Sequence, residues 1–188
     1  MITILERDQY VIEDSNICFI NGEINDETTE YVYRFIIEKN NFDNGKETPD
    51  HLKMIINSPG GFLTDCMAIV DMMKAYPIPV WTYAAGHICS CGLIIFMMGT
   101  PGNRFIFKNT SILSHQWSGG NMGKAHELKA GIKGDKLNTK KIYGLYEEAT
   151  GMSKEDIDKY LLPPEDIWLS PSEAVKYGIG DKVITKIV

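Results

Sequence analysis

The feature that most constrains the fold is an order that repeats along the chain: a short apolar run, a turn, and a segment with apolar residues at helical spacing. Short apolar runs bounded by turn residues predict buried strands. The predicted strands lie at residues 17–22, 52–58, 79–85, 104–107, 111–114 and 182–188, and the predicted helices at 63–75, 90–99, over most of 122–160 and within 168–178. Strands that alternate with helices predict an α/β domain with parallel strand pairing.

Turn and cap residues set the predicted boundaries of individual elements. The first strand is expected to begin at residue 17. Asp26 is the predicted N-cap of the helix that follows, because its carboxylate can accept hydrogen bonds from the first helical amides. Gly86 is expected to end the strand at 79–85, and the segment 42–50 reads as a polar loop.

Size and charge exclude several classes of protein. A chain of 188 residues can bury a core within one domain, which we take to span residues 1–188. A net charge of −6 and the lack of a basic stripe argue against nucleic acid or an anionic membrane as the main partner. The longest apolar stretch, near residues 93–98, is too short to span a bilayer. Charges near the N-terminus do not fit a signal peptide, so a cytoplasmic protein is expected.

Residues 86–92, GHICSCG, hold two of the four cysteines, which stand at positions 18, 66, 89 and 91. A zinc site uses four ligands, commonly in Cys-x₂₋₄-Cys pairs, and a redox site prefers Cys-x-x-Cys. The Cys-x-Cys spacing of Cys89 and Cys91 fits neither, and neither His87 nor Cys66 supplies a clear second pair. We therefore expect both thiols to pack as small apolar groups, with no metal and no cofactor.

Ser90, between these cysteines, has two interpretations. It follows a predicted strand and precedes a buried helix, so its hydroxyl is either an ordinary N-cap or a nucleophile. A strand-to-helix turn exposes the hydroxyl, and the helix N-terminus places backbone N–H groups beside it. A nucleophile also needs a base, an orienting acid and an oxyanion hole, which must come from elsewhere in the chain.

Among the four histidines, His115 is the best candidate base. It ends a predicted strand and is followed by a glycine pair. His87 lies too close to Ser90 in sequence to face it easily, and His126 lies on a charged helix. The Pro-Gly-Gly turn within INSPGG (residues 56–61) is either a plain turn or a source of backbone N–H groups facing a cavity.

Together these segments resemble the ClpP family, the proteolytic subunit of the Clp protease, from residue 17 to residue 188. The resemblance is carried by INSPGG (56–61), GHICSCG (86–92), HQWSGG (115–120) and DIWLSPSEAVKYG (166–178), which occur in the family's order and spacing. Several motifs in the right order are a stronger signal than any one of them.

The resemblance implies a role for each matching residue. Ser90 would be the nucleophile, His115 the general base and Asp166 the acid that orients the imidazole. Gly61 and Cys91 would donate backbone N–H groups to the oxyanion. An extended peptide substrate would bind along Phe62, Leu63, Ser118 and Gly119. Asp156, Asp158 and Asp181 lie near Asp166 in sequence and stay open as alternative acids.

The resemblance also implies a crotonase-like ββα superhelix with a protruding helical handle, at about residues 122–149. Family members are serine endopeptidases that form heptameric rings, often stacked to a tetradecamer, fed by an ATP-dependent AAA+ unfoldase. A homo-oligomer is expected here, because apolar handle positions would otherwise face water: Leu128, Ile132, Leu137, Ile142 and Leu145. Two alternatives remain: a catalytically weak structural ring subunit that joins other ClpP-like subunits, and a crotonase-fold enzyme that acts on acyl-CoA.

This chain departs from the family pattern in several places. The residues before the nucleophile, Ile88 and Cys89, are larger than usual, and Glu165 stands where a ring-locking Arg is common. The segment before the first strand is short, and residues 42–50 form an insertion. At the family's unfoldase-docking positions stand Lys53, Ile55, Tyr83, Phe105 and Phe107, one of which is charged. Gly131 and Gly134 lie within the handle, and each costs about 1 kcal/mol of helix stability.

Overall fold

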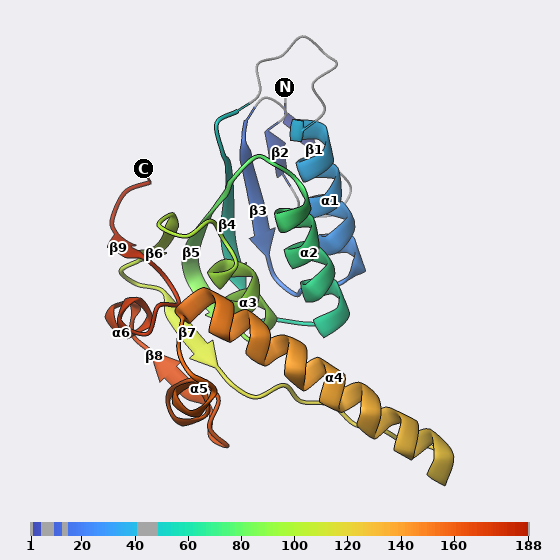
Figure 1. The fold of residues 1–188 in the computed structure, drawn as a ribbon. Coiled ribbons are helices and arrows are strands. Elements are labelled where there is room, and N and C mark those ends of the chain that lie inside the picture. The colour runs from blue at the N-terminus through green and yellow to red at the C-terminus, as the bar shows by residue number, and fades with distance from the viewer. Residues whose placement is uncertain (1, 5–9, 13–14, 41–48, 188) are drawn as a thin grey trace.

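A computed structural model describes residues 2–4, 10–12, 15–40 and 49–187 (Figure 1). The elements in chain order are β1 (Ile2–Ile4), β2 (Tyr10–Ile12), β3 (Ile17–Asn21), α1 (Asp26–Asn40), β4 (Leu52–Ser58), α2 (Leu63–Ala75), β5 (Val80–Cys89), α3 (Cys91–Met97), β6 (Arg104–Phe107), β7 (Ser111–Ser114), α4 (Ala125–Thr150), α5 (Lys154–Tyr160), β8 (Ile167–Leu169), α6 (Pro171–Lys176) and β9 (Lys182–Ile184). The expected alternation of strands and helices is confirmed.

The main sheet has seven strands within the described part of the chain. Strands β3, β4, β5, β6 and β9 follow one another in that order, while β7 pairs with β5 and with β8. Every pairing in this sheet is parallel except that of β7 with β8, which is antiparallel. Parallel pairing across helical connections is the arrangement that the sequence predicted.

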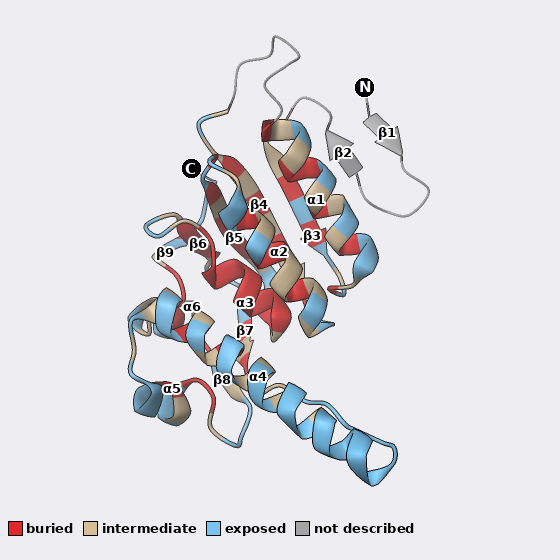
Figure 2. Ribbon diagram, turned by 45° about the vertical axis from the view of Figure 1, so that its right-hand side comes forward, coloured by how far each residue is buried: buried red, intermediate tan, exposed pale blue. Residues whose placement is uncertain are grey.

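Helices α1, α2 and α3 lie on one side of the sheet and contribute buried residues to the core (Figure 1). Along β4 buried residues alternate with half-buried ones, so one strand face points into the core. All seven residues of α3 are buried, which makes this helix the centre of the molecule (Figure 2). A helix that is apolar on every side needs such a position.

Helix α4 projects away from the rest of the molecule, as expected for the helical handle at about residues 122–149 (Figures 1 and 2). Leu128, Ile132 and Leu137 are exposed by 37%, 53% and 52%, so the handle residues expected to face water do so. The expectation was wrong for Ile142, which is 4% exposed because the C-terminal half of α4 packs on the core. Leu145 is half-buried against the same core.

Three predicted boundaries were wrong. Strands β1 and β2 pair antiparallel before residue 17, and three-residue runs such as these are too short to show a period. Asn25, not Asp26, caps α1, since its Oδ1 accepts from the Thr28 amide at 3.0 Å. Strand β5 continues through Gly86 to Cys89. Most of the insertion at 42–50 lies outside the described residues.

In the described ranges, no helix has an apolar segment of the length that a membrane crossing requires.

Candidate active site

Strand β5 reaches the site because Gly86 bends it without ending it. Gly86 has φ 70°, and an added Cβ would lie 2.5 Å from the Asn57 side chain, so glycine suits this position. Before the bend β5 pairs with β6, and after it with β7. The bend therefore carries the end of β5, and the residue after it, to a different neighbour strand.

Ser90 follows β5 in a strained conformation. Its φ and ψ are 52° and −122°, and it is the one non-glycine residue with positive φ in the described part of the chain. A conformation of this kind costs on the order of 1–3 kcal/mol and is kept where the surroundings enforce it. The Ser90 amide donates to the Leu113 carbonyl at 3.2 Å, which ties the turn to β7.

The N-cap interpretation of Ser90 is wrong in its usual sense. Ser90 occupies the N-cap position of α3, but its side chain makes no capping hydrogen bond. By contrast, Ser153 and Ser170 cap α5 and α6 by accepting from the amides of Asp156 and Glu173. The Ser90 hydroxyl is thus left available at a strand-to-helix turn, with the first-turn amides of α3 beside it.

The Pro-Gly-Gly turn packs directly against Ser90. A Cβ on Gly60 would lie 2.7 Å from the Ser90 Cβ and 3.0 Å from the Cys89 carbonyl, so a larger residue would displace the turn. Ile24 holds the turn from the other side, because its amide donates to Gly60 and its carbonyl accepts from Phe62, each at 2.8 Å.

This bridge orients the backbone of Gly61. Ile24 bonds to the Gly60 carbonyl and to the Phe62 amide, which flank Gly61. Because successive residues of a strand point their backbone polar groups to opposite sides, the N–H and carbonyl of Gly61 point away from Ile24. The Gly61 carbonyl accepts from the Cys91 thiol at 3.3 Å. The Gly61 carbonyl therefore lies beside the start of α3, next to Ser90.

A pocket of about 180 Å³ lies in front of these groups. Ser90 and His115 both line it, as do the expected oxyanion residues Gly61 and Cys91. Its complete lining is Gly61, Phe62, Leu63, Ser90, Cys91, Ile94, His115, Trp117, Ser118, Ile142 and Tyr146. Among the residues expected to bind substrate, Gly119 is outside this lining.

The other three histidines lie elsewhere. The backbone of His87 on β5 bonds to Asn57, and His126 is exposed beside Glu127. His51 stacks on Trp81 with 3.7 Å between the ring centroids. His115 is thus the one histidine that shares a pocket with Ser90.

His115 and Asp166 lie just past the ends of two paired strands. On β7 and β8 the last antiparallel pair is Ser114 with Ile167. Continuing this register by one residue on each chain would set His115 opposite Asp166, and directly opposite residues in a sheet have Cβ atoms about 4.5–5.5 Å apart. Asp166 is exposed and is not part of the pocket lining.

The hydrogen bonds of a Ser–His–Asp relay are not formed among these three described residues. His115 Nδ1 instead donates to the Gln116 carbonyl at 2.6 Å. Because a carbonyl can only accept, Nδ1 carries the proton in this contact, and in the neutral imidazole Nε2 is then the acceptor. A general base needs that tautomer.

The three alternative acids are engaged elsewhere. Asp181 forms an ion pair with Arg104 at 2.6 Å, and Asp158 bonds to Tyr143 and Lys154. Asp156 bonds to Ser153 at the start of α5. None of these three carboxylates lines the pocket that contains Ser90 and His115.

The thiols around Ser90 are buried and reduced. Cys66 and Cys91 interact with each other: their hydrogen bond lowers the pKa of Cys91, and the same bond together with burial raises the pKa of Cys66 well above 9.0. Burial also raises the pKa of the Cys89 thiol. No cluster of three or more metal-ligating side chains occurs within the described residues.

A separate aromatic cluster lies on the other face of the sheet. Phe19, Ile55, Tyr83 and Phe105 lie in one cross-strand row over β3, β4, β5 and β6. Tyr83 and Phe105 stack at 5.0 Å and are buried, and Ile55 and Phe107 pack half-buried against them. Four of the five expected docking residues therefore meet in this cluster, and Lys53 precedes them on β4.

Sequence reasoning missed four pocket walls: Ile94, Trp117, Ile142 and Tyr146. Trp117 stands inside the HQWSGG motif but was given no role. Ile142 and Tyr146 are spaced i and i+4 on α4, which indicates a shared helix face but not what it covers. Tyr146 is fully buried, which raises the pKa of its hydroxyl, and this hydroxyl lies 2.8 Å from Ser114 Oγ.

Comparison with known protein families agrees with the motifs and the geometry. The family model described as Clp protease matches residues 6–187, which is nearly the whole chain. The family implies the ClpP fold, and the parallel sheet, the six described helices and the projecting α4 fit it. The chain therefore belongs to the Clp protease family.

Proposed function

We propose that the chain is a serine endopeptidase that cleaves unfolded polypeptides inside a ring-shaped chamber. The observation that carries the proposal is the strained, uncapped Ser90 at a helix N-terminus, sharing a pocket with His115. Serine peptidases need an exposed hydroxyl, a base within reach and amide donors for the oxyanion. That Ser90, His115, Gly61 and Cys91 line one pocket supports the proposal.

In the proposed mechanism, His115 Nε2 takes the proton of the Ser90 hydroxyl as Ser90 Oγ attacks the peptide carbonyl. The amides of Gly61 and Cys91 stabilise the oxyanion, and His115 then protonates the leaving amine. Asp166 accepts from His115 Nδ1 in this scheme. That step requires the imidazole to exchange its contact with the Gln116 carbonyl for the carboxylate opposite it, and such contacts often tighten only when substrate binds.

The substrate would lie in an extended conformation between two segments. Phe62 and Leu63 on one side, and Ser118 on the other, line the pocket and offer backbone groups for strand addition. Gly119 belongs to the same proposed binding segment.

Fluorophosphonate labelling tests the proposal directly. We expect stoichiometric labelling of Ser90 and cleavage of a fluorogenic peptide, with both lost in the Ser90→Ala variant and assembly unchanged. A Ser114→Ala variant is the control, because Ser114 Oγ is buried and bonded to the Leu161 carbonyl. Labelling that persists in Ser90→Ala would disprove the nucleophile, and absence of labelling in the native protein would favour the acyl-CoA or structural alternatives.

The alternative function is a catalytically weak ring subunit that assembles with other ClpP-like chains. The contact of His115 with Gln116, in place of Asp166, is the observation in its favour. In that case the isolated chain would show no peptidase activity, but it would raise the yield of rings when mixed with an active subunit. Mass measurement of mixed assemblies would detect this.

We also propose a cytoplasmic, single-domain subunit that forms a homo-oligomeric ring and receives substrate from a AAA+ unfoldase. Clp protease family members form ring oligomers with such unfoldases. The proposed docking site is the accessible edge of the aromatic cluster, where Phe19 is exposed and Ile55 and Phe107 are half-buried, and the exposed handle supports assembly.

A further inference from the structure

Two thiols from different helices meet beside Ser90. Cys66 lies in the first turn of α2, where its amide donates to the Phe62 carbonyl at 3.0 Å, and Cys91 is the first residue of α3. The Cys66 thiol donates to the Cys91 carbonyl at 3.6 Å, and the two side chains are also close enough to hydrogen-bond to each other. The fold therefore brings together two sulfur atoms whose residues are 25 positions apart in the sequence.

Cys91 is the member of the pair that a small molecule can reach. It lines the pocket beside Ser90, whereas Cys66 is fully buried and is not part of this lining. The hydrogen bond from Cys66 lowers the pKa of the Cys91 thiol, while the same bond and burial raise the pKa of Cys66. Because the thiolate is the reactive form of cysteine, Cys91 is the thiol of this pair that attacks an oxidant first.

The other two cysteines of the chain lack this combination. Cys89 is 7% exposed and lies outside the pocket lining, and burial raises the pKa of its thiol. Cys18 is fully buried, and burial raises the pKa of its thiol to about 12. Cysteines that sense oxidants typically have a low pKa, some access to solvent and a second thiol nearby. Cys91 meets all three conditions.

We propose that Cys66 and Cys91 form a reversible disulfide when the protein meets a small peroxide, and that this bond switches off the candidate active site. The effect on activity rests on the proposed peptidase function, whereas formation of the disulfide does not.

The chemistry needs the peroxide and the two thiols alone. The Cys91 thiolate attacks one peroxide oxygen, the O–O bond breaks, and the hydroxide that leaves takes up the thiol proton as water. Cys91 is then a sulfenic acid. The Cys66 sulfur attacks the Cys91 sulfur, the S–O bond breaks, and the departing hydroxide leaves with the Cys66 proton as a second water. The two thiols thus lose two electrons and two protons, and hydrogen peroxide is reduced to two waters.

The disulfide would disturb both proposed oxyanion donors. A sulfur–sulfur bond of about 2.05 Å is much shorter than a contact between two thiols, so the first residue of α3 must shift toward α2. The Cys91 thiol would also lose the hydrogen that it donates to the Gly61 carbonyl at 3.3 Å, a contact that holds Gly61 against α3. The backbone amides of Cys91 and Gly61 would then no longer lie where the proposed mechanism uses them.

Intact mass, peptide mapping and activity test the proposal on the native protein. After hydrogen peroxide in small excess, we expect the mass to fall by that of two hydrogen atoms. Trypsin should release residues 54–74 joined to residues 75–104, the peptides that contain Cys66 and Cys91. Peptidase activity should fall about tenfold or more, since loss of one oxyanion donor commonly lowers kcat by about 10²–10³. Dithiothreitol should restore both the mass and the activity.

Three variants assign the bond to its two thiols. Cys66→Ser removes the second thiol and should keep its activity in the absence of peroxide. Peroxide should then leave a sulfenic acid on Cys91 that a dimedone probe labels, followed by higher oxidation that dithiothreitol does not reverse. Cys66→Ala repeats this test if the serine variant does not fold. Cys89→Ala is the matched control, because Cys89 shares a tryptic peptide with Cys91, and this variant should still form the disulfide.

The possible failures are distinguishable. A native protein that keeps four free thiols, at a peroxide concentration that oxidises the urea-unfolded chain, would overturn the proposal. A disulfide that involves Cys18 or Cys89 would also overturn it, and a Cys66–Cys91 bond that leaves peptidase activity unchanged would overturn the switch. A reduced protein that neither cleaves peptides nor labels with fluorophosphonate would refute the proposed function instead. The mapped disulfide would still decide the thiol chemistry in that case.

Discussion

At the residue scale, Ser90 shows a conflict between stability and the proposed chemistry. Its positive φ lies in a region that L-residues rarely adopt, and it gains no capping hydrogen bond in return. Glycine would fit the same backbone at lower cost. Glycine would thus relieve the strain at position 90, but it has no reactive side chain. The presence of serine despite the strain supports a functional reason for its hydroxyl.

This strain predicts an order of stabilities. The free energy of unfolding of the Ser90→Gly variant should be about 1 kcal/mol higher than that of Ser90→Ala. Alanine retains the penalty for positive φ at this position, and glycine does not. Urea unfolding at matched protein concentration measures the difference. Ser170→Gly against Ser170→Ala is the control pair, since Ser170 has φ −70° and no such strain. An equal or lower stability of Ser90→Gly would show that the turn is not strained.

The strand register at His115 predicts the role of Asp166. Asp166→Asn should lower kcat by a factor on the order of 10³–10⁴, because an amide cannot hold the imidazolium that forms during catalysis. Asp156→Asn and Asp158→Asn should change kcat little, since both carboxylates bond to neighbours outside the pocket. Steady-state kinetics with one peptide decides between them, and a fully active Asp166→Asn would remove Asp166 from the mechanism.

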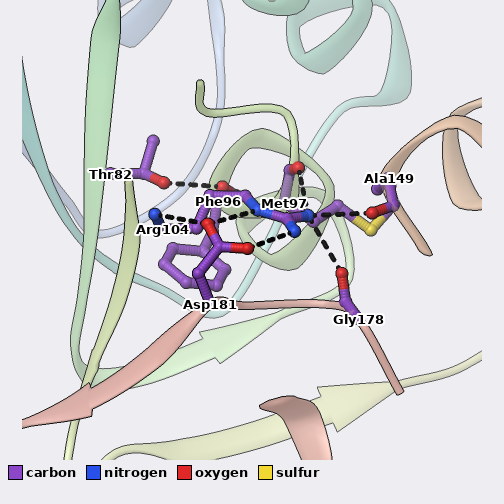
Figure 3. Close-up of polar contacts among 7 residues, drawn as sticks. All are labelled: Thr82, Phe96, Met97, Arg104, Ala149, Gly178 and Asp181. Atoms are coloured by element: carbon purple, nitrogen blue, oxygen red, sulfur yellow. Dashed lines mark hydrogen bonds and ion pairs between the residues drawn. The ribbon is translucent and has the colours of Figure 1, made fainter. Parts of the chain in front are cut away.

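At the element scale, Arg104 joins the ends of three helices (Figure 3). Its Nη1 donates to the carbonyls of Met97, Ala149 and Gly178, which lie at or just beyond the C-terminal ends of α3, α4 and α6. A cation is favoured there, because helix C-termini carry partial negative charge. Asp181 completes the arrangement by accepting from the Arg104 amide, Nε and Nη2.

Removing this guanidinium should be costly. Arg104→Met is expected to lower the free energy of unfolding by about 3–5 kcal/mol, because it leaves a largely buried carboxylate and three carbonyls without their donor. The Arg104→Met, Asp181→Leu double variant should lose less, since it removes both charges. Denaturation of the two variants at pH 7 tests this, and a double variant less stable than Arg104→Met would contradict it.

The same ion pair predicts a dependence on pH. Burial alone would raise the pKa of Asp181, but its bonds with Arg104 hold that pKa below the ordinary 3.8. The stabilisation is therefore complete above the unfolded pKa and is lost as pH falls through the lower folded value. In Arg104→Met, burial without the guanidinium should place the pKa of Asp181 above 3.8. The stability gap between native protein and Arg104→Met should therefore begin to shrink as pH falls through this raised pKa, and it should continue to shrink until the lowered native pKa is passed. A gap that is unchanged at low pH would exclude this linkage.

Elements with strong periodic signals were predictable, and those that depend on distant contacts were not. The long apolar runs of β4 and α3 indicated buried elements correctly. The extension of β5 past Gly86 depends on β7, which lies more than twenty residues further along. Likewise, the order of the motifs indicated Ser90 and His115, but only the folded chain shows that Trp117 lines their pocket and that Arg104 links three helix ends.

At the scale of the whole molecule, the handle is the part that one chain leaves unpaired. The N-terminal half of α4 stands away from the core, with Leu128, Ile132 and Leu137 exposed (Figure 2). The side chain of Leu137, for example, is 52% exposed on the part of α4 that stands away from the core. Burying such residues against a second copy would recover about 25 cal/mol per Å² of apolar surface. Assembly is thus the simplest way to stabilise the handle.

We expect a heptameric ring whose pairing into a tetradecamer is weak and sensitive to salt. Glu165 is exposed where a ring-locking Arg is common in the family, and Gly131 and Gly134 lower the intrinsic helix stability of the handle. Single surface ion pairs contribute about 0–1 kcal/mol, but repetition around a ring adds them, so salt should dissociate the rings from each other. Replacing Gly134, where an added Cβ would meet nothing, with Ala should strengthen the pairing. Native mass spectrometry over a salt series measures both effects: a monomer at micromolar concentration would refute the ring, and a tetradecamer indifferent to salt would refute the weakened pairing.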